Sequence, residues 1–138
     1  QYAKANQYYE RALKINPNFV AAANNLAWNY AEHGGNLDLA LPLAQKAREI
    51  DPDSPHILDT LGWIYYKSGL FDNAVVLLED SSEKLNNGDA VVLYHLGMAY
   101  HRDGRNAQAR DTFDRALKLN KDFPGAEEAR KLLASEPY

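Results

Sequence analysis

Histidine is the side chain in this sequence best suited to acid–base or metal chemistry, because its charge changes near neutral pH. There are four histidines, and the two closest in sequence, His95 and His101, are six residues apart. Two metal ligands on one face of a helix are instead three or four residues apart. His33 falls in a predicted turn. We therefore expect imidazoles that are solvated or line a groove, and no metal site.

Other chemical groups give no stronger indication of catalysis. The chain has no cysteine, which excludes disulfides, thiolate metal sites and a cysteine nucleophile. No Ser-His-Asp arrangement, glycine-rich phosphate loop or pair of carboxylates with a reason to shift its pKa can be singled out. The sequence therefore predicts a protein that is not an enzyme and that holds no cofactor.

Composition indicates one soluble, folded unit. The chain has 138 residues, of which 46% are hydrophobic and 25% are charged, and its formal net charge is -4. Acidic and basic residues are interspersed, so the chain lacks the basic stripe that binds nucleic acid. No apolar run approaches the roughly 18 residues that cross a bilayer. We expect neither a nucleic-acid partner nor direct insertion into a membrane.

The elements that would position these side chains repeat along the chain. The segments NLAWNYAEHG (25–34), TLGWIYYKSG (60–69) and HLGMAYHRDG (95–104) align at a constant spacing of 35 residues. Between them lies a second series, in which an alanine is followed four positions later by another apolar residue. Its members are Ala5, Ala40, Ala74 and Ala109, followed by Tyr9, Ala44, Leu78 and Phe113. Each unit therefore contains two patterns of helical period joined by a short glycine-containing turn.

Eight helices follow from these patterns. We predict them at residues 2–15, 19–33, 36–49, 54–68, 71–85, 89–103, 106–119 and 124–134. Asp53 or Ser54 is placed to cap the fourth helix, with Pro55 in its first turn, and Asp89 is placed to cap the sixth. The turn at 34–36 has one residue more than its equivalents, so we expect its conformation to differ.

The repeated pattern resembles the tetratricopeptide repeat (TPR). The matching residues are Leu58, Leu61, Gly62, Tyr65, Ala74 and Leu78 in one unit and Leu93, Leu96, Gly97, Tyr100, Ala109 and Phe113 in the next; Ala23, Leu26, Ala27, Tyr30, Ala40 and Ala44 match less fully. The resemblance covers nearly the whole chain. It implies an all-α fold, a right-handed α-solenoid of antiparallel helix pairs. One pair cannot bury its apolar face alone, so neighbouring pairs must stack.

In this register the chain divides into five parts. They are the second helix of a truncated repeat (1–19), three TPR units (20–54, 55–89 and 90–123), and a C-terminal capping helix with its tail (124–138). Because the first helix lacks its partner, we expect the natural protein to continue upstream with more repeats. The last helix has alanines and leucines on one side and charged residues on the other, which suits a solvent-facing cap or the first helix of a further repeat.

The resemblance also implies that the first helix of each pair lines a concave surface. Trp63 lies about 160° from Leu61 around its helix, so we expect it on this surface, in one row with Trp28 and Met98. The predicted partner-binding residues are Asn24, Asn25, Trp28, Glu32, His56, Asp59, Thr60, Trp63, Tyr66, Lys67, Tyr94, His95, Met98, His101 and Arg102. Large apolar groups on such a wall usually mark an interaction site. The alternative is that side chains of adjacent helices cover Trp28 and Trp63, which would then only pack.

One type of partner found in the family is not expected here. Some TPR co-chaperones hold the C-terminal carboxylates of heat-shock chaperones with a set of lysine, asparagine and arginine side chains. The matching positions in this sequence are Asn24, Trp28, Thr60, Val91 and His95. The cationic clamp is therefore missing, which argues against binding of a chaperone tail.

Three kinds of function remain. The first is a non-catalytic scaffold that binds a peptide or a protein segment in the concave groove. The alternative is a self-assembly module, in which the incomplete N-terminal end or a convex surface docks onto other copies or further repeats. The third is a non-catalytic part of a larger enzyme or secretion machine. Residues 24–69 resemble bacterial TPR proteins, including lipoproteins of exopolysaccharide export and exosortase-type sorting, which fits an envelope-associated or periplasmic location and also the bacterial cytoplasm.

Overall fold

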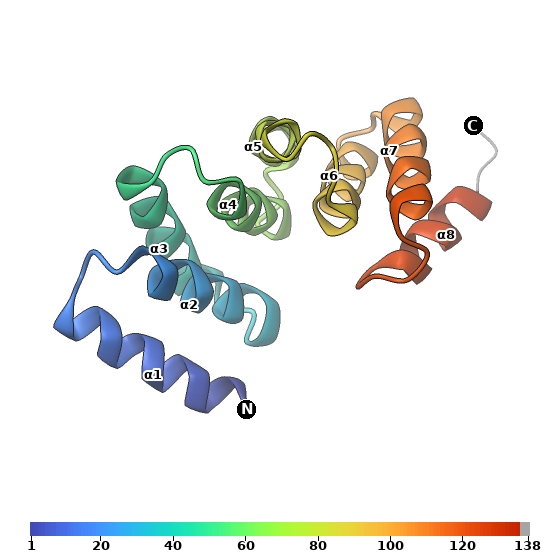
Figure 1. Cartoon of the computed structure of the whole chain (residues 1–138). Coiled ribbons are helices and arrows are strands. Elements are labelled where there is room, and N and C mark those ends of the chain that lie inside the picture. Colours follow the sequence, from blue (N-terminus) through green and yellow to red (C-terminus); the bar gives the residue numbers. More distant parts are fainter. Residues whose placement is uncertain (136–138) are drawn as a thin grey trace.

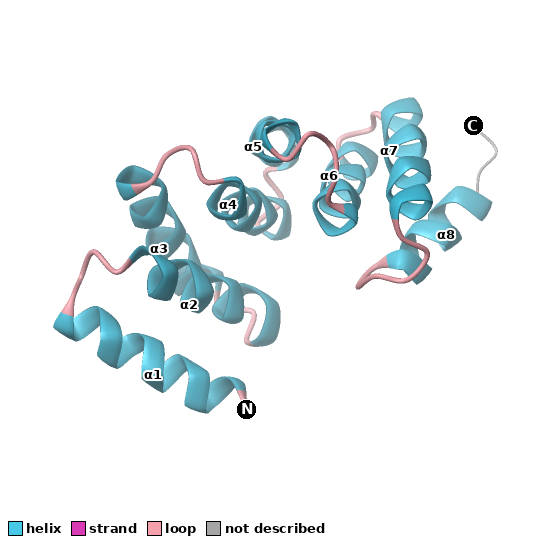
Figure 2. Ribbon diagram, viewed as in Figure 1, coloured by secondary structure: helices cyan, strands magenta, loops and turns pink. Residues whose placement is uncertain are grey.

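The structure, a computed structural model, describes residues 1–135, which form eight helices and no strand (Figure 2). The helices are α1 (Tyr2–Ile15), α2 (Val20–His33), α3 (Leu37–Ile50), α4 (Pro55–Lys67), α5 (Phe71–Lys84), α6 (Ala90–Arg102), α7 (Asn106–Leu119) and α8 (Ala126–Ala134). All eight predicted helices are present, and each begins and ends within two residues of its predicted position. The end of the predicted tail, residues 136–138, lies outside the described residues.

The helices stack in a curved row that follows the chain (Figure 1). The first helices of the pairs, α2, α4 and α6, lie on the inner side of the curve, and their partners α3, α5 and α7 lie on the outer side (Figure 1). The most extensive contacts join the two helices of each pair, and smaller contacts join each pair to the next. The fold is the predicted all-α solenoid of antiparallel helix pairs.

The two helices of a pair approach closely at a small residue of the inner helix. A Cβ atom added at Gly62 would lie 2.8 Å from Cγ of Leu78, and one added at Gly97 would lie 2.5 Å from the ring of Phe113. In the α2–α3 pair, alanine occupies both equivalent positions. A large side chain on the outer helix therefore goes with glycine on the inner helix, and a small one goes with alanine, so the contact stays close-packed in every pair.

The turn within a pair uses glycine where the backbone must become left-handed. Gly69 has a φ of +83°, and beyond it the N–H of Leu70 donates to the carbonyl of Tyr65 at 2.9 Å. In the first pair the equivalent hydrogen bond runs from the N–H of Asn36 to the carbonyl of Tyr30, also at 2.9 Å, and encloses one residue more. The predicted difference in this turn is therefore confirmed.

Two inner helices begin at the caps that the sequence predicts. The side chain of Ser54 accepts a backbone hydrogen bond from the first turn of α4, and Pro55 occupies the first helical position. Asp89 caps α6, since its Oδ1 accepts from the N–H groups of Val91 (2.9 Å) and Val92 (3.1 Å). These caps satisfy backbone donors that have no partner within the helix.

Neighbouring pairs are joined by tyrosines of the inner helices. Each tyrosine hydroxyl forms a hydrogen bond with a side chain on the outer helix of the preceding pair. The bonded residues are Tyr30 with Glu10, Tyr65 with Gln45 and Tyr100 with Glu79. Tyr100 is the most deeply buried of the three tyrosines, at 7% exposed. A ring that packs within the stack and a hydroxyl that reaches back to the previous pair together fix the register between pairs.

The two ends of the row are covered to different degrees. α1 has no buried residue. Its Ala5, Tyr9 and Ala12 are half-buried, whereas the equivalent positions of α3, all alanines, have no exposed surface. At the other end, Ala126 and Ala129 of α8 are buried in the core that α6 and α7 form. The alanines on the apolar face of α8 are thus buried, and the repeat face of α1 stays half open.

We expect Gly97→Ala to lower the free energy of unfolding by about 1–2 kcal/mol. The new methyl group would overlap with the ring of Phe113, and overpacking costs about 1–3 kcal/mol, of which the higher helix propensity of alanine offsets up to about 1 kcal/mol. Urea denaturation followed by far-UV circular dichroism measures the change.

Gly34→Ala is the matched control, because a Cβ atom there would make an ordinary contact of 3.6 Å with the carbonyl of Tyr30. Its effect should stay within about 0.5 kcal/mol. Equal effects of the two substitutions would contradict the close approach at Gly97.

Candidate functional site

A pocket of about 350 Å³ lies on the inner side of the curve, between α2, α4 and α6. Its lining residues are Asn24, Asn25 and Trp28 from α2, His56, Asp59 and Thr60 from α4, and Asp89, Val91, Val92 and His95 at the start of α6. Each wall belongs to a different helix pair, so the pocket exists only when three pairs stack. Its volume lies in the range of ordinary ligand sites, about 300–1,000 Å³.

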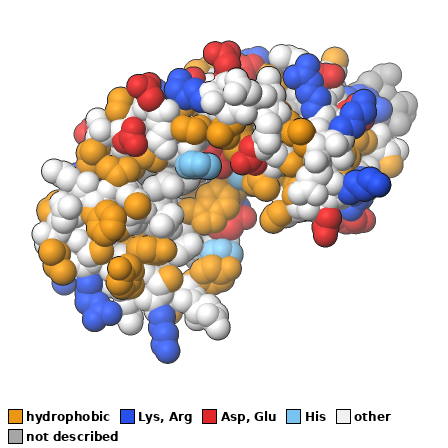
Figure 3. All heavy atoms as spheres, in the orientation of Figure 1, with side chains coloured by type: hydrophobic (Ala, Val, Ile, Leu, Met, Phe, Trp, Pro, Cys, Tyr) orange, Lys and Arg blue, Asp and Glu red, His pale blue; other side chains and the backbone are white. Residues whose placement is uncertain are grey.

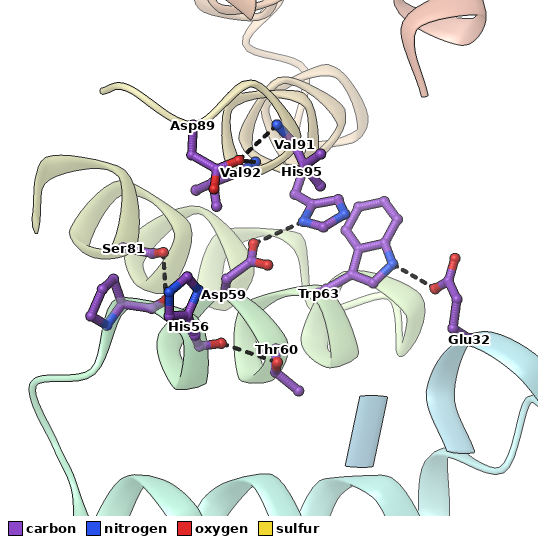
Figure 4. Close-up of polar contacts among 11 residues, drawn as sticks. Glu32, His56, Asp59, Thr60, Trp63, Ser81, Asp89, Val91, Val92 and His95 are labelled. Carbon is purple, nitrogen blue, oxygen red and sulfur yellow. Dashed lines mark hydrogen bonds and ion pairs between the residues drawn. The ribbon is translucent and has the colours of Figure 1, made fainter. Parts of the chain in front are cut away.

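An imidazole holds one of the carboxylates of this pocket in place. Nδ1 of His95 donates to Oδ1 of Asp59 across a distance of 2.8 Å (Figure 4). His95 is only 4% exposed, and its ring stacks on that of Trp63 with the centroids 4.1 Å apart. Because the imidazole is fixed on both sides, it also fixes the direction in which the Asp59 carboxylate points.

A second carboxylate is fixed by the backbone of α6. Oδ1 of Asp89 accepts the two N–H groups that it caps (Figure 4). Among residues 1–135, the structure gives no hydrogen bond to Oδ2 of Asp89 or to Oδ2 of Asp59. Both carboxylates therefore keep one oxygen for another donor, and no lysine or arginine belongs to the lining of the pocket.

Next to the pocket, Trp63 joins the three inner helices. Its indole stacks on the ring of Tyr66, with centroids 4.4 Å apart and planes within 3° of parallel, and also on the ring of His95. Its Nε1 donates to Oε2 of Glu32 on α2 at 3.0 Å (Figure 4). The same glutamate oxygen lies 3.5 Å from Nζ of Lys67. A tryptophan with such neighbours is packed on every side.

The two tryptophans of the predicted row therefore differ. Trp63 lies on the concave side, but it is only 6% exposed, so the alternative in which adjacent helices cover it describes this indole. Trp28 is half-buried and lines the pocket, with its ring centroid 5.6 Å from that of His95. Trp28 is the indole that a ligand in the groove can touch.

Four predicted groove residues belong to α6 but do not line the pocket. Met98 and Tyr94 pack against the core that α5, α6, α7 and α8 share. Burial, with the negative charge of Glu128 adding to it, raises the pKa of Tyr94 to about 12, so this phenol is neutral at physiological pH. Arg102 covers the ring of Phe71, with its guanidinium carbon 4.8 Å from the centroid. The fourth, His101, has a buried Nδ1 without a hydrogen-bond partner among the described residues.

The predicted set thus separates into three groups along the inner surface. Seven of its residues, Asn24, Asn25, Trp28, His56, Asp59, Thr60 and His95, line the pocket. Glu32, Trp63, Tyr66 and Lys67 form the adjacent stack, and Tyr94, Met98, His101 and Arg102 lie towards α5 and α8. Asp89, Val91 and Val92 complete the pocket without having been predicted for it. The place of Asp89 in the pocket could have been predicted from its role as a cap, because a cap puts that carboxylate at the start of an inner helix.

Two other kinds of site are absent from the described part of the chain. Within residues 1–135, no three histidine, aspartate or glutamate side chains converge in a way that could hold a metal ion. None of the helices in that range is both long and apolar enough to pass through a lipid bilayer.

Comparison with known sequences identifies one family. Two sequence models, both described as tetratricopeptide repeat, match residues 1–55 and 90–123, together more than half of the chain. A TPR repeat-containing protein of Pseudomonas aeruginosa is 33% identical over 81 residues, which are 59% of this chain and 13% of that protein. The chain therefore corresponds to a small part of this relative.

Several solved structures share the fold. MamA superimposes with a TM-score of 0.75 and 21% identity over 96% of this chain and 85% of that chain. YrrB, described as a TPR protein with an unusual peptide-binding site, superimposes with a TM-score of 0.76 and 23% identity. The match covers 94% of this chain and 66% of that chain. A thermophilic TPR protein of Thermus thermophilus superimposes with a TM-score of 0.79 and 24% identity. The match covers 96% of this chain and 71% of that chain. At these identities the likeness concerns the fold.

The difference between the two indoles can be measured, since they are the only tryptophans of the chain. Trp63→Phe leaves Trp28 as the single emitter, and Trp28→Phe leaves Trp63. We expect acrylamide to quench the fluorescence of Trp63→Phe more strongly, with emission at longer wavelength, because Trp28 reaches solvent and Trp63 does not. Equal quenching of the two variants, with unchanged circular dichroism, would contradict the described burial.

Proposed function

Since the chain belongs to the tetratricopeptide repeat family, we propose that it is a non-catalytic scaffold that holds a segment of another protein in its concave groove. The observation that carries this proposal is the open pocket between three inner helices, which offers amides, carboxylates and the half-buried Trp28 to a ligand. The peptide-binding site described for YrrB supports the use of this fold for such binding.

The groove supplies the two kinds of contact that peptide recognition needs. Asn24 and Asn25 carry amide groups that can donate to and accept from a peptide backbone. Trp28 supplies apolar area, and an aromatic anchor at the centre of an interface can contribute about 2 kcal/mol or more. Trp63 is covered and supports this surface indirectly, because its contacts with Glu32 and His95 hold α2, α4 and α6 together.

Selection from a library of random displayed peptides tests this function while the natural partner is still unidentified. We expect peptides selected on the wild-type protein to bind Trp28→Ala at least about tenfold more weakly, which corresponds to about 1.4 kcal/mol. Leu39→Ala is the matched control, because Leu39 is an apolar residue that is 48% exposed on the outer helix α3.

If the selected peptides bind Trp28→Ala and the wild-type protein alike, or if Leu39→Ala weakens them as much, then binding takes place elsewhere. Circular dichroism of each variant shows that the helices remain folded.

Self-assembly is the second candidate function, and the open face of α1 favours it. Ala5, Tyr9 and Ala12 are half-buried there, although the same positions of the repeat are covered in α3. A second copy that packs onto this face would bury it. Apolar area removed from water stabilises such a contact by about 25 cal/mol per Å².

Light scattering over a range of concentrations tests the assembly. If the protein self-assembles, its mass should rise with protein concentration. Ala5→Glu should abolish this rise, because it places a charge in the contact between copies. Ala3→Glu, at an exposed position of the same helix, is the control and should not change the mass. A monomer at every concentration would eliminate self-assembly through this face.

A further inference from the structure

The pocket between α2, α4 and α6 carries an excess of negative charge. Two carboxylates, Asp59 and Asp89, belong to its lining, and no lysine or arginine does. The nearby cations are already engaged, since Lys67 lies 3.5 Å from Glu32 and Arg102 covers the ring of Phe71. Figure 3 shows acidic and histidine side chains among hydrophobic ones on the hollowed side, with the visible Lys and Arg side chains towards the edges.

Several acceptor atoms of this pocket receive no hydrogen bond from the described residues. Oδ1 of Asn24 is buried and has no hydrogen-bond partner among the described residues. Oδ2 of Asp59 and Oδ2 of Asp89 also accept no hydrogen bond from the described residues, and both belong to partly exposed side chains. Thr60 does not supply the missing donor, because its hydroxyl donates to the carbonyl of His56 at 3.0 Å. Three acceptors, on α2, on α4 and at the start of α6, are therefore open to a group that donates several hydrogen bonds.

We propose that this pocket takes a cationic side chain, arginine or lysine, from the protein segment that occupies the groove. The proposal rests on the function proposed above and names the partner's chemistry. A guanidinium carries five N–H donors and no acceptor, and an ammonium carries three donors. Trp28 adds an aromatic surface to the pocket, and indole is the ring that attracts a cation most strongly.

The same features disfavour an anionic ligand. A phosphate or the carboxylate of a peptide C-terminus would meet two carboxylates of fixed position and no lysine or arginine. Placing like charges together in a partly desolvated site is costly. This groove therefore selects a partner of opposite charge to the acidic tails that cationic TPR clamps hold.

Three capped pentapeptides test the proposal directly: Ala-Ala-Arg-Ala-Ala, the same peptide with citrulline in place of arginine, and the same peptide with glutamate. Citrulline keeps the shape of arginine and removes its charge. Titrations followed by ¹H–¹⁵N NMR should give saturable shifts at Asn24, His56 and Asp59 with the arginine peptide only. A single anchored side chain is expected to bind with a dissociation constant of order 1 mM.

Charge-neutralising variants identify the groups that bind the arginine peptide. We expect Asp59→Asn and Asp89→Asn each to weaken it about fivefold to tenfold, since a charge-assisted hydrogen bond is about twice as strong as a neutral one. Asparagine is as good a helix cap as aspartate, so Asp89→Asn keeps α6 intact. Asp38→Asn, on an exposed site of α3, is the control for net charge and should have no effect.

Salt gives an independent measure of the same interaction. Between about 0.1 M and 1 M salt the Debye length falls from about 10 Å to about 3 Å, so binding of the arginine peptide should weaken.

The proposal is overturned if citrulline or glutamate peptides shift the same residues equally, if the arginine shifts lie elsewhere, or if none appear at about ten times the expected dissociation constant. Peptides that depend on Trp28 but contain no arginine or lysine would overturn this inference and leave the scaffold function standing. The absence of any Trp28-dependent peptide would remove both.

Discussion

The structure depends on how closely the two helices of each pair approach at one small residue. Where the outer helix carries Leu78 or Phe113, the inner helix carries glycine, and no room remains for a Cβ atom. This contact sets the separation within a pair, and the separation sets where the inner helix lies relative to the next one. The shape of the concave surface is therefore decided by residues that a ligand never touches.

The concave surface in turn is assembled from contacts between pairs. Tyr100 and its equivalents reach the preceding outer helix, while Trp63 spans α2 and α6 through Glu32 and His95. His95 has two tasks, since it packs on the indole and holds the Asp59 carboxylate. Packing and recognition thus share one imidazole, and a change in the stack would alter the polar wall of the pocket as well.

Much of this arrangement could be predicted from the repeat spacing. The spacing determines which faces are apolar, and the caps at Ser54 and Asp89 follow from local chemistry. The predicted helix boundaries therefore lie within two residues of the observed ones. The coverage of Trp63 could not be predicted in the same way. A helical wheel tells on which side a residue lies, but the rotation between successive pairs decides which neighbours cover it.

The pocket illustrates the same limit. Asp89 was predicted as a cap, yet its part in the pocket depends on the path of the loop that leads into α6. In this loop, residues 85–89, Asn86 and Asn87 both adopt left-handed backbone with φ of +55°. Sequence pattern indicates a turn at this place but not its direction.

The tyrosine hydrogen bonds have a mechanical consequence. Because each hydroxyl joins one pair to the preceding pair, a pulling force along the chain would load these links in series. The pairs would then separate one after another instead of all at once. Rupture would begin at α1, whose side chains have the least buried contact, and the molecule would lengthen in steps, each the size of one repeat.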